Sequence, residues 1–360
     1  MNHIFKDVRD WMVTYIILKT LNHGMESRFF KVEANGVRCT ICPHLCVIPE
    51  RKRGICNTKE NQGGTIISLT YGKISALAVD PIEKKPLAHF LPGSSALSIS
   101  SIGCNFACPW CQNSGLSMSS IDDVQTKFMH PEEVVQVAMT QECESIAYTY
   151  NEPLINLNYV EDTARFANDS DIKNVLVTNG FVHNPSLLQV VDVIDAANVD
   201  WKGWNKEFYR KHCNGDLGQV IDATEAMHDN GVHVEVTFLI IPDTNDDETE
   251  IREMTRYIHY NLGPDTPLHL SRFFPHYKFK HLSPTPTETL IKARKIAIEE
   301  GLRHVYVGNT RETGYEDTIC PICGEHVVKR RGYTITNWGL DEQNQCNKCG
   351  EPIPIIGSPP

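Results

Sequence analysis

The sequence has little that would mark a membrane protein or a secreted one. The apolar stretch WMVTYIIL at residues 11–18 is far shorter than the roughly 20 residues that a membrane-spanning helix needs. No cleavage-site pattern follows it, so we expect neither a secretory signal nor stable membrane insertion. We interpret the stretch as an amphipathic helix packed on the body of the protein, with a partner-binding or membrane-surface helix as the alternative. The packing residues would be Trp11, Ile16, Ile17 and Leu18.

An excess of positive charge is also missing. The 360 residues include 34 Lys and Arg against 45 Asp and Glu, which gives a formal net charge of −11. A nucleic-acid-binding protein usually carries a basic stripe, whereas the short basic run at 329–331 lies between two cysteine pairs. We therefore expect no nucleic-acid partner. Repeats of solenoid period are absent as well, which argues against a repeat architecture.

Cysteine, by contrast, is abundant. The chain has 13 cysteines, and most of them fall into three groups with short CxxC and CxxxC steps, a spacing that favours metal binding over disulfides. Free thiols persist in a reducing compartment, so we expect a cytoplasmic protein. Cys143 and Cys213 stand alone and are interpreted as small core residues. The groups are Cys39/Cys42/Cys46/Cys56, Cys104/Cys108/Cys111 and Cys320/Cys323/Cys346/Cys349.

From residue 96 onward, short apolar runs alternate with amphipathic helical stretches. Helices are predicted from Pro131, over 246–260 and over 285–301. Strand–helix–strand repetition at this spacing predicts a parallel sheet with right-handed crossovers. Six or seven such units suit an α/β fold of the partial TIM-like (β/α)6 barrel type, with an open doubly wound sheet as the alternative. The predicted strands are 96–102, 145–150, 174–178, 196–200, 232–240, 267–273 and 303–308.

The chain divides into four predicted segments. Residues 1–38 form a helical extension, and 39–95 form a cysteine-rich segment with a β-hairpin that turns at Tyr71-Gly72-Lys73. Residues 96–312 form the barrel. The tail at 318–357 breaks the strand–helix rhythm and is predicted to be a small zinc-ribbon-like domain.

Two of the cysteine groups offer four ligands each. In the tail, CPIC and CNKC are each followed by a glycine and predict a closed Zn²⁺ site of four thiolates, with rubredoxin-type iron or loss of the metal as alternatives. In the first group, the spacing C-x2-C-x3-C-x9-C suits either zinc or an auxiliary [4Fe–4S] cluster, and spacing does not choose between them. His44 is an alternative ligand there, although an exposed histidine beside Pro43 is the preferred interpretation.

The middle group, Cys104, Cys108 and Cys111, has only three cysteines and follows the first predicted barrel strand. Loops at the C-terminal ends of barrel strands build active sites. Three thiolates on one loop can hold three corners of a [4Fe–4S] cube and leave the fourth iron open to a small molecule. Trp110, just before the third cysteine, can shield such a cluster from water.

This arrangement resembles the radical S-adenosylmethionine (SAM) superfamily, whose signature is CxxxCxxC with an aromatic residue before the third cysteine. The resemblance implies that Cys104, Cys108 and Cys111 hold a [4Fe–4S] cluster whose open iron chelates SAM. It also implies reductive cleavage of SAM to a 5′-deoxyadenosyl radical, with ferredoxin or flavodoxin as electron donor.

Further positions carry the same resemblance. Asn151-Glu152-Pro153 takes the place of the superfamily's GGE motif, whose acid contacts the SAM amino group, although asparagine replaces a glycine. Thr178-Asn179-Gly180 resembles the TNG element of glycyl-radical activating enzymes, and Asp200 and Lys202 resemble their DxK element. These activases place an acid before TNG, where this chain has Val177. Any site that depends on that acid is not expected here.

The chain from about residue 39 to 357 is most similar to the radical SAM enzyme of the AmmeMemoRadiSam system. This resemblance implies a functional association with a Memo-family protein but no defined reaction. It is carried by CPHLC, YGKISALAVDPIEKKPLAHFLPG, GCNFACPWCQN, YNEP, VTNGF, NVDWKG, SRFFPHYK, VYVGN and CPICG…CNKCG.

The expected function is that of a radical SAM enzyme of unknown substrate. The alternatives are an activase acting on a protein glycine, a non-catalytic iron–sulfur and zinc scaffold, and a zinc enzyme at the middle group. Asp200, Lys202, Arg272 and His276 are weak catalytic candidates near the predicted barrel mouth, and a solvated rim explains them nearly as well. Glu83, Lys84 and Lys85 have the composition of surface charges.

Overall fold

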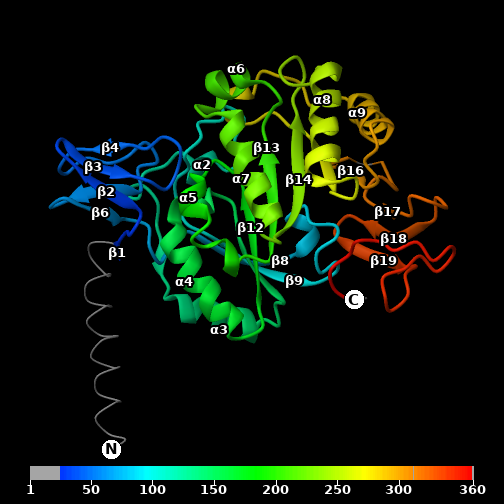
Figure 1. Cartoon of the computed structure of the whole chain (residues 1–360), viewed down its shortest axis with the longest axis horizontal. Helices are drawn as coiled ribbons and strands as arrows, with labels where there is room; N and C mark the ends of the chain where they lie inside the picture. The colour runs from blue at the N-terminus through cyan, green and yellow to red at the C-terminus, as the bar shows by residue number, and fades with distance from the viewer. Residues whose placement is uncertain (1–24, 311, 359–360) are drawn as a thin grey trace, which may run out of the picture.

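The computed structural model describes residues 25–310 and 312–358, so the predicted helix at 11–18 lies outside the described residues. Two small N-terminal sheets lie at one end of the long axis, the C-terminal domain lies at the other, and a large sheet stands between them (Figure 1). Among the described residues, no helix is long and apolar enough to cross a membrane.

The large sheet has eight strands in the order β16-β15-β14-β13-β12-β11-β9-β8. Seven of them run parallel, and β8 is antiparallel to β9. The edge strands β16 and β8 are not paired with each other in the described part of the chain, so the barrel is open. The strands are β8 (Ala76–Pro81), β9 (Ser95–Ser100), β11 (Ser145–Tyr148), β12 (Lys173–Thr178), β13 (Ala196–Trp201), β14 (His233–Ile240), β15 (Leu268–Arg272) and β16 (Val305–Gly308).

All seven predicted strands are present, and they are parallel, as the strand–helix rhythm predicted. A strand covered on both faces carries near-continuous apolar residues, which is why these runs were recognisable. The count exceeds the six units of a (β/α)6 barrel by one, and β8 adds an antiparallel edge that the rhythm did not predict.

The helices begin where local capping favours them. Pro131 opens α3 (Pro131–Thr140), and the Glu133 carboxylate accepts a hydrogen bond from the His130 backbone N–H at 2.7 Å. Asp247 caps α8 (Glu248–Tyr257) by accepting from the N–H groups of Thr249 and Glu250. The other helices are α2 (Ser114–Ser117), α4 (Leu157–Asn168), α5 (Asn184–Leu187), α6 (Lys206–Phe208), α7 (Leu217–Asp229) and α9 (Thr287–Glu299).

The N-terminal region differs from the prediction. Residues 25–39 form strands rather than a helix, and the runs on either side of Tyr71-Gly72-Lys73 do not pair with each other. The segment at 65–68 instead forms a hairpin with 59–62 through Gly63-Gly64. One sheet is β1 (Met25–Glu26), β6 (Thr65–Ser68) and β5 (Lys59–Gln62); another is β2 (Phe30–Glu33), β3 (Gly36–Cys39) and β4 (Val47–Ile48); β7 (Lys73–Ile74) pairs with β10 (Lys127–Phe128).

The C-terminal domain is a three-stranded antiparallel sheet with its own small core, which includes Val327, Leu340 and Ile353. Its strands are β17 (Thr318–Ile319), β18 (His326–Arg331) and β19 (Thr334–Trp338). The domain docks on the segment after β8: Ile356 pairs with Phe90, and Arg330 reaches the backbone of that segment.

The segment after β8 is also more buried than its composition predicted. Lys85 is 1% exposed and pairs with Asp80 at 2.7 Å, and the Glu83 side chain lies 3.7 Å from Arg330. Burial alone would raise the pKa of Asp80, but hydrogen bonds from Lys84, Lys85 and Tyr150 lower it far below its usual value. Of the three predicted surface charges, only Lys84 is exposed to any extent.

Candidate active site

The loop that carries Cys104, Cys108 and Cys111 follows β9 at the C-terminal edge of the parallel strands. It starts at Gly103, whose φ is +90°. A Cβ there would lie 2.5 Å from Thr58 Cγ2 and 2.8 Å from the Cys56 carbonyl oxygen. Only glycine permits both this φ and this close approach. All three cysteines line one cavity, the mouth cavity, whose empty volume is about 1010 Å³.

The spacing of the three sulfur atoms does not suit a single zinc ion. Four thiolates around zinc lie about 3.8 Å apart, because each Zn–S bond is about 2.3 Å long and the geometry is tetrahedral. Among the described residues, only the tail cysteines bring three or more ligand atoms within 4.8 Å of one another. A [4Fe–4S] cube holds its thiolates farther apart, since each one binds a different iron. The arrangement therefore fits a cluster.

The thiols of this loop need a metal to become thiolates. Burial and the charge of Glu152 raise the pKa of Cys104 well above its usual value. The pKa of Cys108 is also raised, first by the neighbouring Cys213 sulfur and then by burial. Both cysteines would therefore stay protonated at neutral pH without iron, and cluster binding would release their protons.

Two neighbours of the loop shape the space around it. Cys213 is buried, as predicted for a core residue, but its sulfur lies 3.8 Å from Cys108 Sγ, a proximity that the isolated position in the sequence did not reveal. Trp110 is 3% exposed, lines the mouth cavity and packs on Phe208 and Phe279. It is thus placed to exclude water, as its position in the motif predicted.

Glu152 lies at the end of β11 and presents its carboxylate to the mouth cavity. Its Oε1 accepts hydrogen bonds from Leu154 N at 2.9 Å and Thr178 Oγ1 at 2.7 Å, and its Oε2 accepts one from Asn179 N at 2.8 Å. Burial raises the pKa of Glu152 above its usual value, while these donors oppose the shift. Oε2 keeps a lone pair that can accept from an ammonium group of a ligand.

The other residues that were predicted to bind the cofactor together with Glu152 mainly form hydrogen bonds within the protein. Asn151 lines the cavity, and its side chain accepts from Ser101 N at 3.0 Å and donates to Gly103 O at 3.2 Å, so it ties the cysteine loop to β11. The Asn179 amide donates toward Cys104 Sγ at 3.5 Å. Pro153 and Gly180 do not line the mouth cavity.

Asp200 and Lys202, at the end of β13, form an ion pair inside the mouth cavity. Although burial favours the neutral amine, the Asp200 carboxylate raises the pKa of Lys202 above its usual value. Among the described residues, the second carboxylate oxygen of Asp200 finds no hydrogen-bond partner, and neither does the hydroxyl of Thr237 in the same cavity. These buried atoms are available to a polar ligand.

Arg272 and His276 do not join them. The Arg272 side chain turns away, donates from Nε to the Thr285 carbonyl at 2.7 Å and stacks over Phe274. His276 precedes a short turn and lines neither the mouth cavity nor its neighbour. Neither residue lines the mouth cavity, and a position near a strand end does not fix the direction of a side chain, so a catalytic role for Arg272 and His276 stays a prediction.

A second cavity, of about 1160 Å³ empty volume, adjoins the mouth cavity and shares Tyr150, Thr237 and Asn309 with it. Its wall includes Glu83 and Lys84 from the segment after β8, and Arg330 and Tyr333 from the C-terminal domain. We call it the side cavity. Sequence reasoning did not predict it, because its wall joins segments about 250 residues apart in the chain.

A profile of the radical SAM superfamily matches residues 98–256, which contain the three loop cysteines, Glu152 and Lys202. The chain belongs to the radical SAM superfamily. An uncharacterized protein of Methanocaldococcus jannaschii is 41% identical over 333 residues, which cover 92% of this chain and 99% of that protein.

Two further relatives show how far the similarity extends. A second M. jannaschii protein, named provisionally as a glycyl-radical enzyme activating enzyme, is 22% identical over 214 residues, or 57% of this chain and 78% of that one. A radical SAM methyltransferase of Sphaerobacter thermophilus, whose crystal structure is known, matches with a TM-score of 0.48 and 16% identity over 62% of this chain and 68% of that chain.

The radical SAM barrel also contains a buried polar network that sequence reasoning missed. Glu235 on β14 is 0% exposed and accepts hydrogen bonds from the backbone of Ala88 and His89. His233 and His269 lie 3.0 and 2.6 Å from its carboxylate oxygens. Burial opposes ionisation of Glu235, but these histidines hold its pKa well below the usual value. The sequence did contain a signal for this network, because Glu235 is a charged residue between two valines in the apolar run VHVEVTF.

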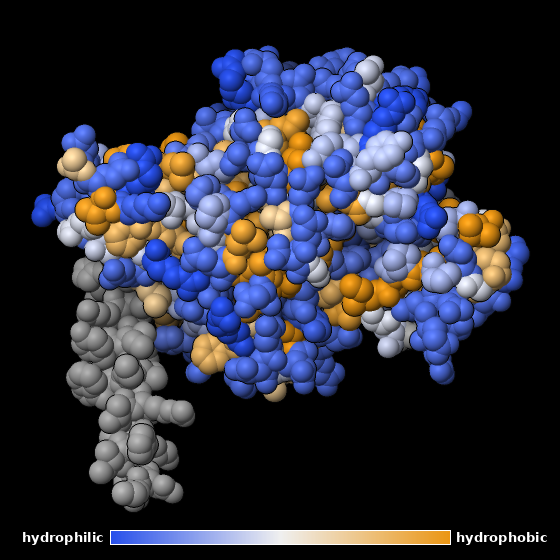
Figure 2. Space-filling view, in the orientation of Figure 1, coloured by the Kyte–Doolittle hydropathy of each residue, from blue (hydrophilic) through white to orange (hydrophobic). Residues whose placement is uncertain are grey.

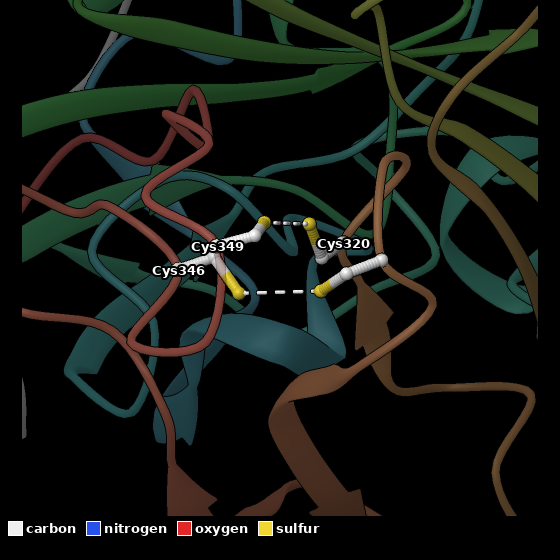
Figure 3. Close-up of side chains that lie close together, drawn as sticks. Cys320, Cys346 and Cys349 are labelled. Atoms are coloured by element: carbon white, nitrogen blue, oxygen red, sulfur yellow. Dashed lines mark hydrogen bonds between the residues drawn. The ribbon is translucent and has the colours of Figure 1, made fainter.

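Outside the radical SAM barrel, the tail cysteines form a compact group (Figure 3). Cys320 Sγ lies 3.5 Å from Cys349 Sγ, and Cys323 Sγ lies 3.7 Å from Cys346 Sγ. Gly324 and Gly350 take positive φ directly after each pair, as a tight ligand turn requires. This group could hold a metal ion, and its domain fits a zinc-ribbon-like unit.

The first cysteine group has a different geometry. Cys39, Cys42, Cys46 and Cys56 surround a separate cavity, and His44 lies beside it. The His44 Nε2 is 2.8 Å from the Asn105 carbonyl oxygen, in the radical SAM loop. His44 is half-buried and its ring nitrogen contacts this carbonyl group, whereas an exposed histidine was predicted.

Proposed function

We propose that this protein cleaves SAM reductively to generate a 5′-deoxyadenosyl radical for hydrogen abstraction from a substrate. The observation that carries the proposal is the mouth cavity, whose wall contains the three loop cysteines and Glu152 together. Glu152 is buried, which costs its carboxylate hydration, and it forms no ion pair with the described residues. An unpaired buried carboxylate beside the three cysteines argues for a ligand site and against a non-catalytic scaffold.

The residues present fit the cofactors that this function needs. A reduced [4Fe–4S] cluster would supply the electron that breaks the sulfonium bond of bound SAM. Cys104, Cys108 and Cys111 would hold the cluster, and Glu152 would accept a hydrogen bond from the SAM amino group. Thr178 and Asn179 orient that carboxylate, and Trp110 excludes water.

The side cavity supports a polar small molecule as the substrate. It opens beside the mouth cavity, and its wall carries two acids, Glu83 and Glu316, and two basic groups, Lys84 and Arg330. Such convergent charges of both signs would orient a zwitterionic group. Lys202, with its ammonium held by Asp200, is positioned to contact either SAM or this substrate.

The test is anaerobic reconstitution with iron and sulfide, followed by dithionite and SAM. We expect 5′-deoxyadenosine from the wild-type protein and none from Cys108→Ala. The buried Cys143, which lies in none of the three groups, offers the matched control Cys143→Ala, which should retain the product. An intact cluster that yields no 5′-deoxyadenosine would overturn the proposal.

A second candidate is activation of a glycyl-radical enzyme, which the 22% identical relative supports. A glycine-containing peptide of a partner enzyme would then receive the radical, and electron paramagnetic resonance would show a glycyl doublet. Small-molecule turnover without any protein radical would decide against this candidate.

The resemblance of the sequence to the AmmeMemoRadiSam enzymes supports the Memo-family partner, the free cysteines support a cytoplasmic location, and the radical SAM chemistry requires a one-electron donor. We place the protein in the cytoplasm with ferredoxin or flavodoxin as electron donor, and in association with a Memo-family protein. Co-purification of the tagged protein with a Memo homologue from its native cells tests the association, and repeated absence under crosslinking contradicts it.

A further inference from the structure

The first cysteine group encloses a cavity that nothing in the radical SAM chemistry uses. Cys39 ends β3, Cys42 and Cys46 follow in the next turn, and Cys56 comes from the loop before β5. All four line one cavity with about 350 Å³ of empty space. Cys39 is buried and the other three are half-buried, so the cavity lies just beneath the surface.

The sulfur spacing in this cavity differs from that in the tail. The tail sulfurs pair at 3.5 and 3.7 Å, close to the separation of about 3.8 Å that tetrahedral zinc requires. No three ligand atoms of the first group lie within 4.8 Å of one another, although all four cysteines belong to the described residues. Four thiolates that line one cavity without converging on a single point suit a group larger than one ion, in which each sulfur binds its own metal atom.

The wall of the cavity suits an anionic inorganic cluster. Ile41, Ile48 and Ile155 make it largely apolar. Lys59 also lines it and is 2% exposed, and its Nζ donates only to Ser68 Oγ, at 2.7 Å. No carboxylate of the described chain lies within ion-pair distance of that ammonium. A buried cation requires a counter-charge, and four metal-bound thiolates would provide it.

The cavity adjoins the radical SAM loop. Gly103, the residue before Cys104, lies close to the first cysteine group. A Cβ atom built on Gly103 would be only 2.8 Å from the Cys56 carbonyl oxygen. His44 contacts Asn105 at 2.8 Å, so the cysteine turn and the radical SAM loop are in contact at two points. A third cavity includes both Cys56 and Cys104 in its wall.

The outer side of this region suits an acidic protein partner. Ile55 and Val47 are 53% and 39% exposed directly beside Cys56 and Cys46. On this outer side Lys31, Arg51 and Lys52 are exposed and form no ion pair with the described residues, whereas Arg28, Arg38 and Arg53 each pair with a carboxylate. Figure 2 shows hydrophobic and hydrophilic side chains side by side over the β2–β4 sheet. Such a mixed basic and apolar patch complements an acidic one-electron carrier.

We propose that Cys39, Cys42, Cys46 and Cys56 hold a second [4Fe–4S] cluster, through which electrons enter the protein. A reduced ferredoxin or flavodoxin gives one electron to this cluster, which passes from the 2+ to the 1+ state. The electron then moves to the cluster at Cys104, Cys108 and Cys111, and the second cluster returns to 2+. The delivery step rests on the proposed function, whereas the cluster itself does not.

The cluster is tested with the full chain carrying Cys104→Ala, Cys108→Ala and Cys111→Ala, reconstituted without oxygen. We expect about four iron and four sulfide per chain and an electron paramagnetic resonance signal on reduction. A second zinc in place of iron, or no metal beyond the tail site, would overturn the assignment. Because the first cysteine group is unchanged, this variant avoids any folding defect that its removal would cause. The wild-type and Cys143→Ala proteins should each hold about eight iron.

Electron delivery is tested with Cys46→Ala/Cys56→Ala, provided that about four iron remain in the radical SAM cluster. We expect formation of 5′-deoxyadenosine to be lost with photoreduced flavodoxin but to continue with dithionite, which reduces the cluster directly. Equal activity with both reductants, or equal loss, would overturn the delivery role. If the wild-type protein forms no 5′-deoxyadenosine, the proposed function fails, while the iron count still decides the second cluster.

Discussion

Glu152 is the residue on which SAM binding would depend most directly. Its carboxylate already receives three hydrogen bonds, so its position is fixed before a ligand arrives. Glu152→Gln keeps the size but removes the charge. A hydrogen bond to a charged group contributes about 1.5–3 kcal/mol, so we expect SAM affinity to fall about 10- to 100-fold. Anaerobic equilibrium dialysis against the reconstituted protein measures this.

The control for this variant is Glu161→Gln on α4. Glu161 is also a buried carboxylate, but it pairs with Arg28 and Arg165 away from the mouth cavity. We expect the Glu161→Gln variant to bind SAM with the wild-type affinity when its iron content is complete. Equal SAM affinity in wild type and Glu152→Gln would show that the carboxylate does not contact the ligand.

His304 makes the stability of the fold depend on pH. Both ring nitrogens are buried without a hydrogen-bond partner, and burial lowers its pKa to about 4. In the unfolded chain His304 takes up a proton near pH 6.5, whereas in the folded chain it does so only near pH 4. The free energy of unfolding therefore falls as the pH drops through this window. Between pH 7 and pH 5 the loss is about 2 kcal/mol.

We therefore expect the urea midpoint of His304→Leu to change less between pH 7 and pH 5 than that of the wild type, as followed by circular dichroism without oxygen. The exposed residue His228 provides the matched control, His228→Leu. An identical pH dependence in wild type and His304→Leu would contradict the assignment.

Strand β18 joins the C-terminal domain to the rest of the molecule through one side chain. Arg330 donates to the Ala88 carbonyl at 2.8 Å and to Thr318 Oγ1 at 2.9 Å, and it lies 3.7 Å from the buried Glu83. Removing one partner of a buried ion pair costs about 3–5 kcal/mol, because the other charge stays buried. We expect Arg330→Met to raise hydrogen exchange in β17–β19.

The double variant Glu83→Gln/Arg330→Met removes both charges and should recover part of the lost protection. If Arg330→Met alone exchanges like the wild type, the docking of β18 does not depend on this side chain.

At the scale of strands and helices, the parallel sheet was predictable because burial on both faces leaves unbroken apolar runs. That strand β8 joins this sheet was not predictable, since four of its six residues are exposed and the last of them is a proline. Strand β5, with the sequence KENQ, has no apolar residue at all, and only its pairing with β6 makes it a strand.

The candidate site was predictable to the extent that its chemistry is local in sequence. Cysteine spacing is fixed by the metal, so the three groups were identified without a structure. The direction of Arg272 and the burial of Lys85 depend on Thr285 and on the Tyr150 ring in turn, and no local pattern encodes these partners. Glu235 was overlooked for the same reason, because its partners come from three separate segments.

On the scale of the whole molecule, we expect the tail metal to be zinc and to hold the C-terminal domain together. Structural zinc binding contributes about 10–16 kcal/mol in small domains, far more than the small core of this one can replace. Cys320→Ser/Cys323→Ser should lose one zinc per chain and expose the tail to protease while the iron content stays constant. Metal analysis with limited proteolysis measures both.

Cys143→Ser serves as the control for this variant, because it removes a thiol outside all three groups. Iron in the tail of the wild-type protein, or an unchanged protease pattern in the double variant, would contradict the prediction.

The pairing of Ile356 with the segment after β8 also sets an order of events during synthesis. The Leu91 N–H donates to the Ile356 carbonyl at 2.7 Å, and the Ile356 N–H donates to the His89 carbonyl at 2.7 Å. Residues 89–91 leave the ribosome long before residue 356 is made, so this contact forms only after the C-terminal domain has been synthesised. Until then the side cavity lacks the part of its wall that Arg330 and Tyr333 provide, so this cavity is completed later than the parallel sheet beside it.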